Sequence, residues 1–192
     1  MTRLRTLAFF LLASVFFGGT YVAVKAGGAY FPPLLFVAIR YDVAAVLLLG
    51  FVLLRTAPSE RYPTSRRDVA GVLATAVFAI GLTNALLFVG QQSTTSAVGS
   101  ILFGLAPILT PVFAAFLLAD EGLSRRGAVG TGLGLVGVAL VVGFDPAMLL
   151  GGGNRGMLLL LGGAVSSALG AVLIRRADAS LSSVVQTAWG SE

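Results

Sequence analysis

Six long apolar stretches, separated by short segments that hold nearly all the charge, dominate this chain. Each is close to the roughly 20 residues that a helix needs to cross the hydrocarbon core of a bilayer. They are too long for barrel strands of about 10 residues, and they do not alternate. Only helices and closed barrels satisfy their own backbone polar groups in lipid, so the pattern predicts an all-α, polytopic membrane helix bundle. The predicted spans are 7–24, 33–54, 69–89, 97–119, 128–142 and 157–174, and an apolar tail at 181–189 is typical of the start of a seventh.

Composition narrows the functions that this bundle can have. The chain is 57% hydrophobic and only 11% charged, whereas soluble domains carry about 25% charged residues. It has no Cys and no His, which excludes disulfides, thiolate or imidazole metal sites, and catalysis by Ser-His or Cys-His pairs. We therefore expect no metal, no cofactor and no enzymatic activity. The net charge of +5 would suit nucleic-acid binding in a soluble protein, but here the basic residues lie in short loops, so we expect no nucleic-acid partner.

The distribution of the basic residues predicts the orientation of the spans. Lys and Arg are enriched in cytoplasmic loops. Ten of them share the side of the N-terminus: Arg3, Arg5, Arg55, Arg61, Arg66, Arg67, Arg125, Arg126, Arg175 and Arg176. Only Lys25 and Arg155 lie on the opposite side. The pattern predicts a multi-pass protein of the cell membrane with a cytoplasmic N-terminus.

A weak internal repeat appears when the chain is shifted by 150 residues along itself. The shift places Val22 on Val172 and Lys25 on Arg175, in a shared order of a small-residue-rich span, a terminal cation, a short link and a new apolar run. Five spans separate the two copies, so the second copy enters the membrane from the other side. Inverted repeats of this kind are common in secondary transporters, which bind substrate between the halves near the midplane. The basic and then apolar N-terminus also fits a signal peptide, but a segment that recurs in mid-chain favours a retained span.

Several short motifs, taken in order, resemble the EamA-type repeat of the drug/metabolite transporter superfamily. They are residues 17–25, 32–40, 85–92, 105–110 and 120–124, followed by a glycine-rich fifth span with Gly134 and Gly137. The resemblance implies a ten-helix transporter made of two five-helix repeats. On that basis we expect a first repeat at 1–145, an outer linker at 146–156, and an incomplete second repeat at 157–192. The second repeat would then be truncated after the start of its second span.

The resemblance implies a secondary transporter, either a permease or an exporter, that moves small metabolites or drugs by alternating access. Two cations near the predicted outer mouth favour an anionic or amphipathic small-molecule solute. The alternative is a non-transporting, truncated membrane subunit that assembles with a partner chain. A homo-oligomer within the lipid bilayer also stays open.

Three charged residues are candidates for the substrate path. Lys25 ends an otherwise uncharged span, and it either snorkels to the interface or faces a central cavity. Arg40 and Asp42 lie inside the second span, where charge is costly and usually faces the bundle interior or water. Because they are two residues apart on a helix they point in different directions, so we expect each to find another partner.

Uncharged polar residues and prolines complete the candidates. Tyr21, Asn84, Gln91 and Gln92 either form packing hydrogen bonds between helices or line the cavity. Pro107 and Pro111, in the middle of the fourth span, each remove a backbone N–H and favour a kink. Kinked helices at midplane depth are frequent in transporters, although a static kink can also serve packing alone.

Overall fold

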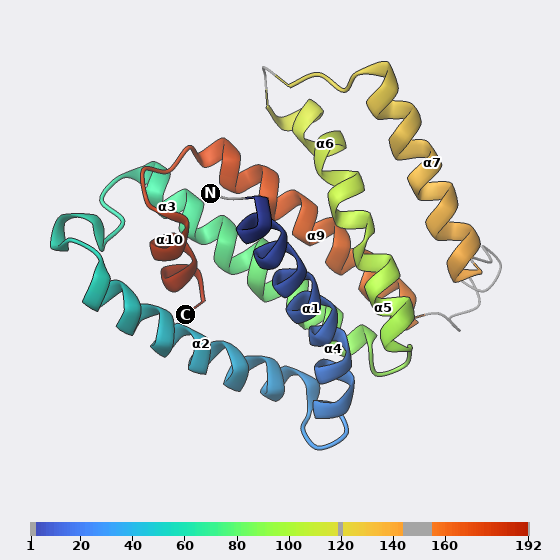
Figure 1. Ribbon diagram of the computed structural model, residues 1–192, viewed down its shortest axis with the longest axis horizontal. Helices are drawn as coiled ribbons and strands as arrows, with labels where there is room; N and C mark the ends of the chain where they lie inside the picture. Colours follow the sequence, from blue (N-terminus) through green and yellow to red (C-terminus); the bar gives the residue numbers. More distant parts are fainter. Residues whose placement is uncertain (1–2, 119–120, 144–154, 192) are drawn as a thin grey trace.

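The computed structural model describes residues 3–118, 121–143 and 155–191, and all regular elements within those ranges are helical (Figure 1). They are α1 (Arg3–Gly27), α2 (Pro33–Arg55), η1 (Pro58–Glu60), α3 (Arg66–Ala74), η2 (Thr75–Leu82), α4 (Thr83–Gly90), α5 (Ser96–Phe103), α6 (Leu105–Leu117), α7 (Arg125–Val142), α9 (Arg155–Ala177) and α10 (Ser183–Gly190). In the described part of the chain, six stretches are long and apolar enough to cross a membrane: α1, α2, α3 to α4, α5 to α6, α7 and α9. The prediction of an all-α, polytopic membrane bundle is confirmed. Most of the expected outer linker lies outside the described residues.

Side-chain caps start four of the helices. Each capping oxygen accepts a backbone N–H from three residues further on, which satisfies one of the donors that a helix start leaves free. The caps are Ser65 for α3, Thr95 for α5, Ser124 for α7 and Ser182 for α10. α2 instead begins with Pro33, whose missing N–H costs nothing at a first helical position. These signals fix where each of these five helices begins.

The third span changes its helical geometry halfway across. α3 and α4 are regular, but η2 between them is a π-helix of 8 residues. The carbonyl of Phe78 within it accepts hydrogen bonds from Thr83 Oγ1 at 2.6 Å and from Ser166 Oγ of α9 at 2.9 Å. A wide turn at mid-span therefore gives a backbone carbonyl an additional partner on a neighbouring helix.

The fourth span is divided into two helices. α5 ends at Phe103, Gly104 forms a turn, and α6 begins at Leu105. Pro107 has no N–H for the carbonyl of Phe103, which is the bond that a continuous helix would need there. Pro111 lies inside α6 without interrupting it.

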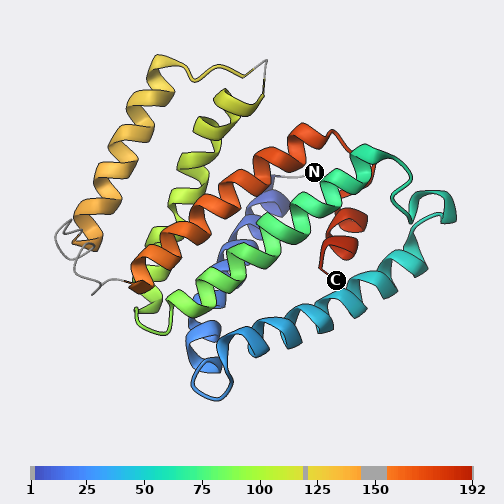
Figure 2. The same ribbon diagram turned by 180° about the vertical axis from the view of Figure 1, so that it is seen from behind.

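α9 is the central helix of the bundle. It packs along the whole third span and along α5 and α6, and Figure 2 shows it beside the third span on the near face. Small residues make this contact close: a Cβ on Gly170 would come within 2.8 Å of the Ala79 backbone nitrogen. A Cβ on Gly163 would come within 2.8 Å of the Phe103 ring. α7, by contrast, leans on α5 and α6 and has no buried residue among those described.

α10 begins the segment that the sequence assigns to a seventh span. It packs against α2 and α3 rather than extending into solvent. Gln186 donates to the carbonyl of Gly71 at 3.2 Å and to Thr75 Oγ1 at 2.9 Å, and the Trp189 indole donates to the carbonyl of Arg61 at 2.7 Å. These bonds attach the C-terminal segment to the third span and to the link that precedes it.

Candidate functional site

A pocket of about 250 Å³ lies where α1 and α4 end. We call it the α1–α4 pocket. It is lined by Val24, Lys25, Gly28, Ala29, Phe88, Gln91 and Gln92. Three candidates from the sequence, which are Lys25, Gln91 and Gln92, therefore come together at one end of the bundle.

The ammonium of Lys25 is held by backbone carbonyls in the link between α4 and α5. Its Nζ donates to the carbonyl oxygens of Gln91 at 2.7 Å, Gln92 at 3.3 Å and Thr94 at 2.7 Å. Gln91 directly follows α4, so the ammonium also lies near the negative end of that helix's dipole, which stabilises a cation. Lys25 thus brings positive charge to the pocket, but its three N–H groups are already used by the protein.

Gln91 is a buried amide between α4 and α5. Its side chain is 1% exposed, and neither its Nε2 nor its Oε1 has a hydrogen-bond partner within the described part of the chain. A Cβ on Gly99 would lie 2.7 Å from Nε2, so the amide fills the space that this glycine leaves. Buried polar groups nearly always have partners, so this amide has an unused donor and an unused acceptor beside the pocket.

Tyr21 and Asn84 lie deeper along the same helix faces. Tyr21, one turn before Lys25 on α1, is 3% exposed and packs edge-on against Phe17 and Phe103 with ring centroids 5.9 Å and 6.0 Å away. Asn84, two turns before Gln91, donates to the carbonyl of Ile80 at 2.8 Å. Both are therefore enclosed by packing, below the pocket rather than in its lining.

Arg40 and Asp42 stand apart from this cluster. Both side chains are exposed on α2, and neither forms an ion pair within the described residues. Within the described residues neither finds the partner that the sequence led us to expect, because both side chains lie on the exposed surface of α2. The Arg40 guanidinium lies only over the ring of its neighbour Tyr41, at 5.7 Å from the centroid. Pro107 and Pro111 are likewise outside the pocket lining, at exposed positions of α6.

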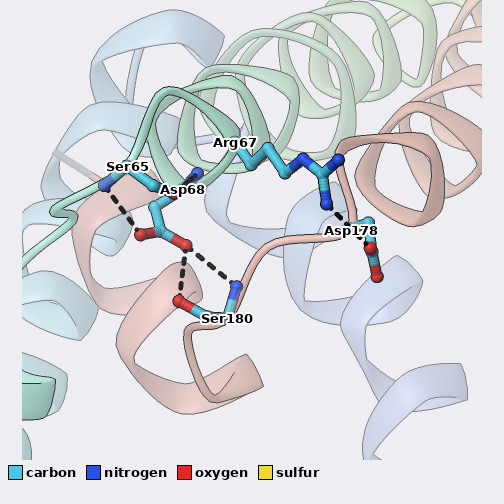
Figure 3. Close-up of polar contacts among 5 residues, drawn as sticks. All are labelled: Ser65, Arg67, Asp68, Asp178 and Ser180. Atoms are coloured by element: carbon cyan, nitrogen blue, oxygen red, sulfur yellow. Dashed lines mark hydrogen bonds and ion pairs between the residues drawn. The ribbon is translucent and has the colours of Figure 1, made fainter.

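Asp68 is the polar residue that sequence reasoning missed. It is fully buried, and its carboxylate accepts the backbone N–H of Ser65 at 3.0 Å and of Ser180 at 2.9 Å, with the Ser180 hydroxyl at 3.0 Å (Figure 3). It therefore closes the cap of α3 and ties it to the link between α9 and α10. The signal was present: Ser65 followed three residues later by Asp68 has the spacing of a capping box. The sequence shows no sign of Ser180, because that contact joins segments far apart along the chain.

Charged pairs at the same end fasten α9 to the first part of the chain. Arg67 pairs with Asp178 at 3.3 Å, as Figure 3 also shows. Arg175 pairs with Glu121 across the link from α6 to α7. Both pairs are exposed, so they orient α9 but contribute little to the free energy of folding.

With this architecture established, comparison with known proteins assigns the family. The model of the EamA-like transporter family matches residues 4–143. The chain belongs to this family. The EamA-type repeat that the motifs predict is thereby confirmed, in a multi-pass membrane protein.

Several curated transporters are similar to the chain. It is 31% identical to the uncharacterised transporter YvbV of Bacillus subtilis over 188 residues, which is 95% of this chain and 57% of the relative. It is 28% identical to the uncharacterised inner membrane transporter YedA of Escherichia coli K12 over 162 residues, 82% of this chain and 49% of the relative. It is also 28% identical to the S-adenosylmethionine/S-adenosylhomocysteine transporter of Chlamydia muridarum over 160 residues, 81% of this chain and 49% of the relative.

The chain spans about half the length of the curated relatives it matches. No solved structure matches it. The family and these relatives are transporters, which agrees with the prediction that the chain is not an enzyme.

Proposed function

We propose that the protein acts as a secondary transporter that moves a small metabolite or drug across the cell membrane by alternating access between two inverted repeats. The family match over residues 4–143 is the observation that carries this proposal. The first repeat occupies 1–145, the outer linker 146–156, and the start of the second repeat 157–192. In this scheme α9 and α10 correspond to α1 and α2.

The positions and directions of these helices support the repeat. α1 ends at Gly27 and α9 at Ala177, while α2 begins at Pro33 and α10 at Ser183, so both boundaries recur at the offset of 150. In Figure 1, α1 and α9 run in opposite directions through the bundle. An antiparallel pair of equivalent spans is what an inverted repeat requires.

The α1–α4 pocket supports a solute path at one end of the bundle. Lys25 supplies positive charge there, and Gln91 supplies an amide whose hydrogen bonds are unused. This chemistry favours an anionic or amphipathic solute. Tyr21, Asn84 and Gln92 extend the same path along α1 and α4. Arg40 and Asp42 on α2, and Pro107 and Pro111 on α6, lie outside the pocket, and we keep them as candidates for other parts of the path. In a proton-coupled cycle Asp42 is the carboxylate that carries the proton.

Solute counterflow tests the proposal. Vesicles containing the purified chain are loaded with excess unlabelled S-adenosylmethionine, chosen because of the Chlamydia relative, and with a panel of other polar metabolites. A carrier then accumulates labelled solute transiently, whereas a channel does not. The variant Asp42→Asn should flatten the pH dependence of uptake, and Asp178→Asn, an exposed carboxylate at the end of a helix, should preserve it. Uptake with unchanged pH dependence in Asp42→Asn would remove Asp42 from the proposal.

The cytoplasmic N-terminus is testable because the chain has no cysteine. Glu60→Cys and Ser93→Cys place single thiols in the links on opposite sides of the third span. In intact cells a membrane-impermeant maleimide should label Ser93→Cys at once and Glu60→Cys only after permeabilisation. The reverse result would invert the proposed orientation.

A second candidate is a non-transporting subunit that assembles with a partner chain. The exposed charges of Arg40 and Asp42 at membrane depth favour it, because charge there is normally covered. Light scattering of the purified chain in detergent measures its oligomeric mass. A strictly monomeric protein would count against assembly, and counterflow by the same sample would exclude the subunit role.

A further inference from the structure

Two adjoining hollows form a groove on the outside of the bundle, between α3 and α9. One, of about 550 Å³, lies between α3, η2 and the end of α9, and the other, of about 420 Å³, lies along the first turns of α3. Both are lined by Ala70 and Leu73. We call them together the α3–α9 groove. Figure 2 shows α3 and α9 side by side.

The groove is basic at its mouth and apolar along its length. Arg66 borders one hollow and Arg176 the other, and both side chains lie at the end of the bundle where α3 begins and α9 finishes. Deeper in, the lining is formed by Leu73, Val77 and Leu173, of which Leu73 is 57% and Val77 50% exposed.

The acidic residues nearby leave these two arginines unneutralised. Within the described residues Arg67 forms an ion pair with Asp178, and Arg175 forms one with Glu121, while Arg66 and Arg176 form none. Asp68, beside Arg66 in sequence, is enclosed by its bonds to Ser65 and Ser180. The chain therefore has two places where arginines are adjacent in sequence, at 66–67 and 175–176. In each, one guanidinium pairs with a carboxylate and the other lies at the groove.

The depth of the groove matches one leaflet of a bilayer. Val77 lies eleven residues after Arg66, which is about 16 Å along a helix axis. Half of the hydrocarbon core is about 15 Å. A lipid whose headgroup lies at the two arginines would place its acyl chain along the apolar part.

We propose that the α3–α9 groove binds an anionic phospholipid. The phosphate lies between the guanidinium groups of Arg66 and Arg176, and one acyl chain lies along Leu73, Val77 and Leu173. Guanidinium groups bind phosphate oxygens in a bidentate manner. A zwitterionic headgroup carries the same phosphate but adds a positive charge that two arginines repel, so the pair favours an anionic headgroup. Basic pockets between spans on the cytoplasmic side are suited to such headgroups, and this end carries most of the basic residues. The proposal is independent of the transported solute.

Photo-crosslinking locates the lipid. The intact chain in phosphatidylcholine vesicles receives a trace of phosphatidylglycerol that carries a diazirine in its acyl chain. We expect crosslinks at Leu73, Val77 and Leu173, and their displacement by unlabelled phosphatidylglycerol but not by inorganic phosphate. Phosphatidylcholine with the same diazirine should give much weaker labelling of the groove. Crosslinks spread evenly over other lipid-facing helices, or equal labelling by the two lipids, would overturn the proposal.

Two double variants of arginine distinguish a specific lipid site from general attraction of anionic lipid to a basic surface. Arg66→Gln with Arg176→Gln should weaken the competing effect of phosphatidylglycerol about 30-fold, since two headgroup contacts are lost. Arg67→Gln with Arg175→Gln removes the same charge from the same end and should leave competition within about twofold, because these arginines already have carboxylate partners. Equal losses in the two double variants would show only general attraction to the surface. Displacement by inorganic phosphate would show an anion site without a lipid. Leu73→Trp, which fills the groove and keeps both arginines, should also abolish the crosslinks.

Discussion

α1 and α9 are equivalent spans by sequence, yet they occupy opposite environments. They have 25 and 23 residues and are similarly apolar, and each ends in a cation followed by a short link. In their most apolar windows, however, 39% of residues are buried in α9 and only 11% in α1. α9 lies at the centre of the bundle, whereas α1 makes its main helix contact with α5.

The hydropathy of a span therefore does not determine how much of it is buried in the bundle. α9 presents glycine, alanine and serine to its neighbours, and these allow backbones to approach closely and form contacts that lipid cannot match. α1 carries bulky side chains that remain exposed, such as Phe9, Phe10 and Phe16. Both helices contain small residues, but Gly163 and Gly170 of α9 lie against neighbouring helices, whereas a Cβ on Gly18 or Gly19 of α1 would meet no atom within 4 Å.

Enlarging one glycine on each helix should reveal the largest difference in stability between α1 and α9. Gly170→Leu in α9 should destabilise the protein by about 3 kcal/mol, because the new side chain meets the backbone of Ala79, which cannot move aside. Gly19→Leu in α1 meets no atom within 4 Å and should change stability by less than about 0.5 kcal/mol. Unfolding in detergent, followed by the fluorescence of Trp189, measures both. Similar losses would mean that α1 is packed as tightly as α9.

Asp68 provides a second contrast, since it fastens the link after α9. Asp68→Asn replaces one carboxylate oxygen with an NH2 group that cannot accept a hydrogen bond, so only one of the two backbone N–H groups, that of Ser65 or that of Ser180, keeps its acceptor. We expect the folded-to-unfolded equilibrium constant to fall about tenfold, with earlier exposure of Trp189 as α10 leaves α3. Asp178→Asn, which removes only an exposed pair, should have a clearly smaller effect. Equal effects would show that the Asp68 contacts do not hold α10.

The cations at the ends of α1 and α9, Lys25 and Arg175, should give the smallest difference in stability. Lys25→Met keeps the apolar stem but removes the ammonium from three carbonyls, and we expect a loss of about 1 kcal/mol. Arg175→Gln breaks one exposed pair with Glu121 and should cost about half as much or less. Chemical unfolding at matched ionic strength measures the two losses. Added salt should reduce the Arg175 effect more than the Lys25 effect, and the opposite salt response would contradict this assignment.

Much of the fold was accessible from the sequence, but the site was accessible only in part. The spans and the proline-containing fourth span follow from local chemistry. The sequence also singled out Lys25 and Gln91. It did not show that carbonyls of the link after α4 hold Lys25, because that contact joins residues 66 to 69 positions apart. Nor did it show that Arg40 and Asp42 would lie exposed, since helical spacing gives direction around an axis but not which neighbour is there.

By itself, then, the sequence determined that this protein crosses a membrane several times as helices, because a backbone in lipid must satisfy its own hydrogen bonds over a fixed thickness. It also determined the family, through the order of its motifs. Only the tertiary structure decided which of two equally apolar spans lies at the centre. That choice depends on the fit of small residues against particular partners, and hydropathy contains no information about it.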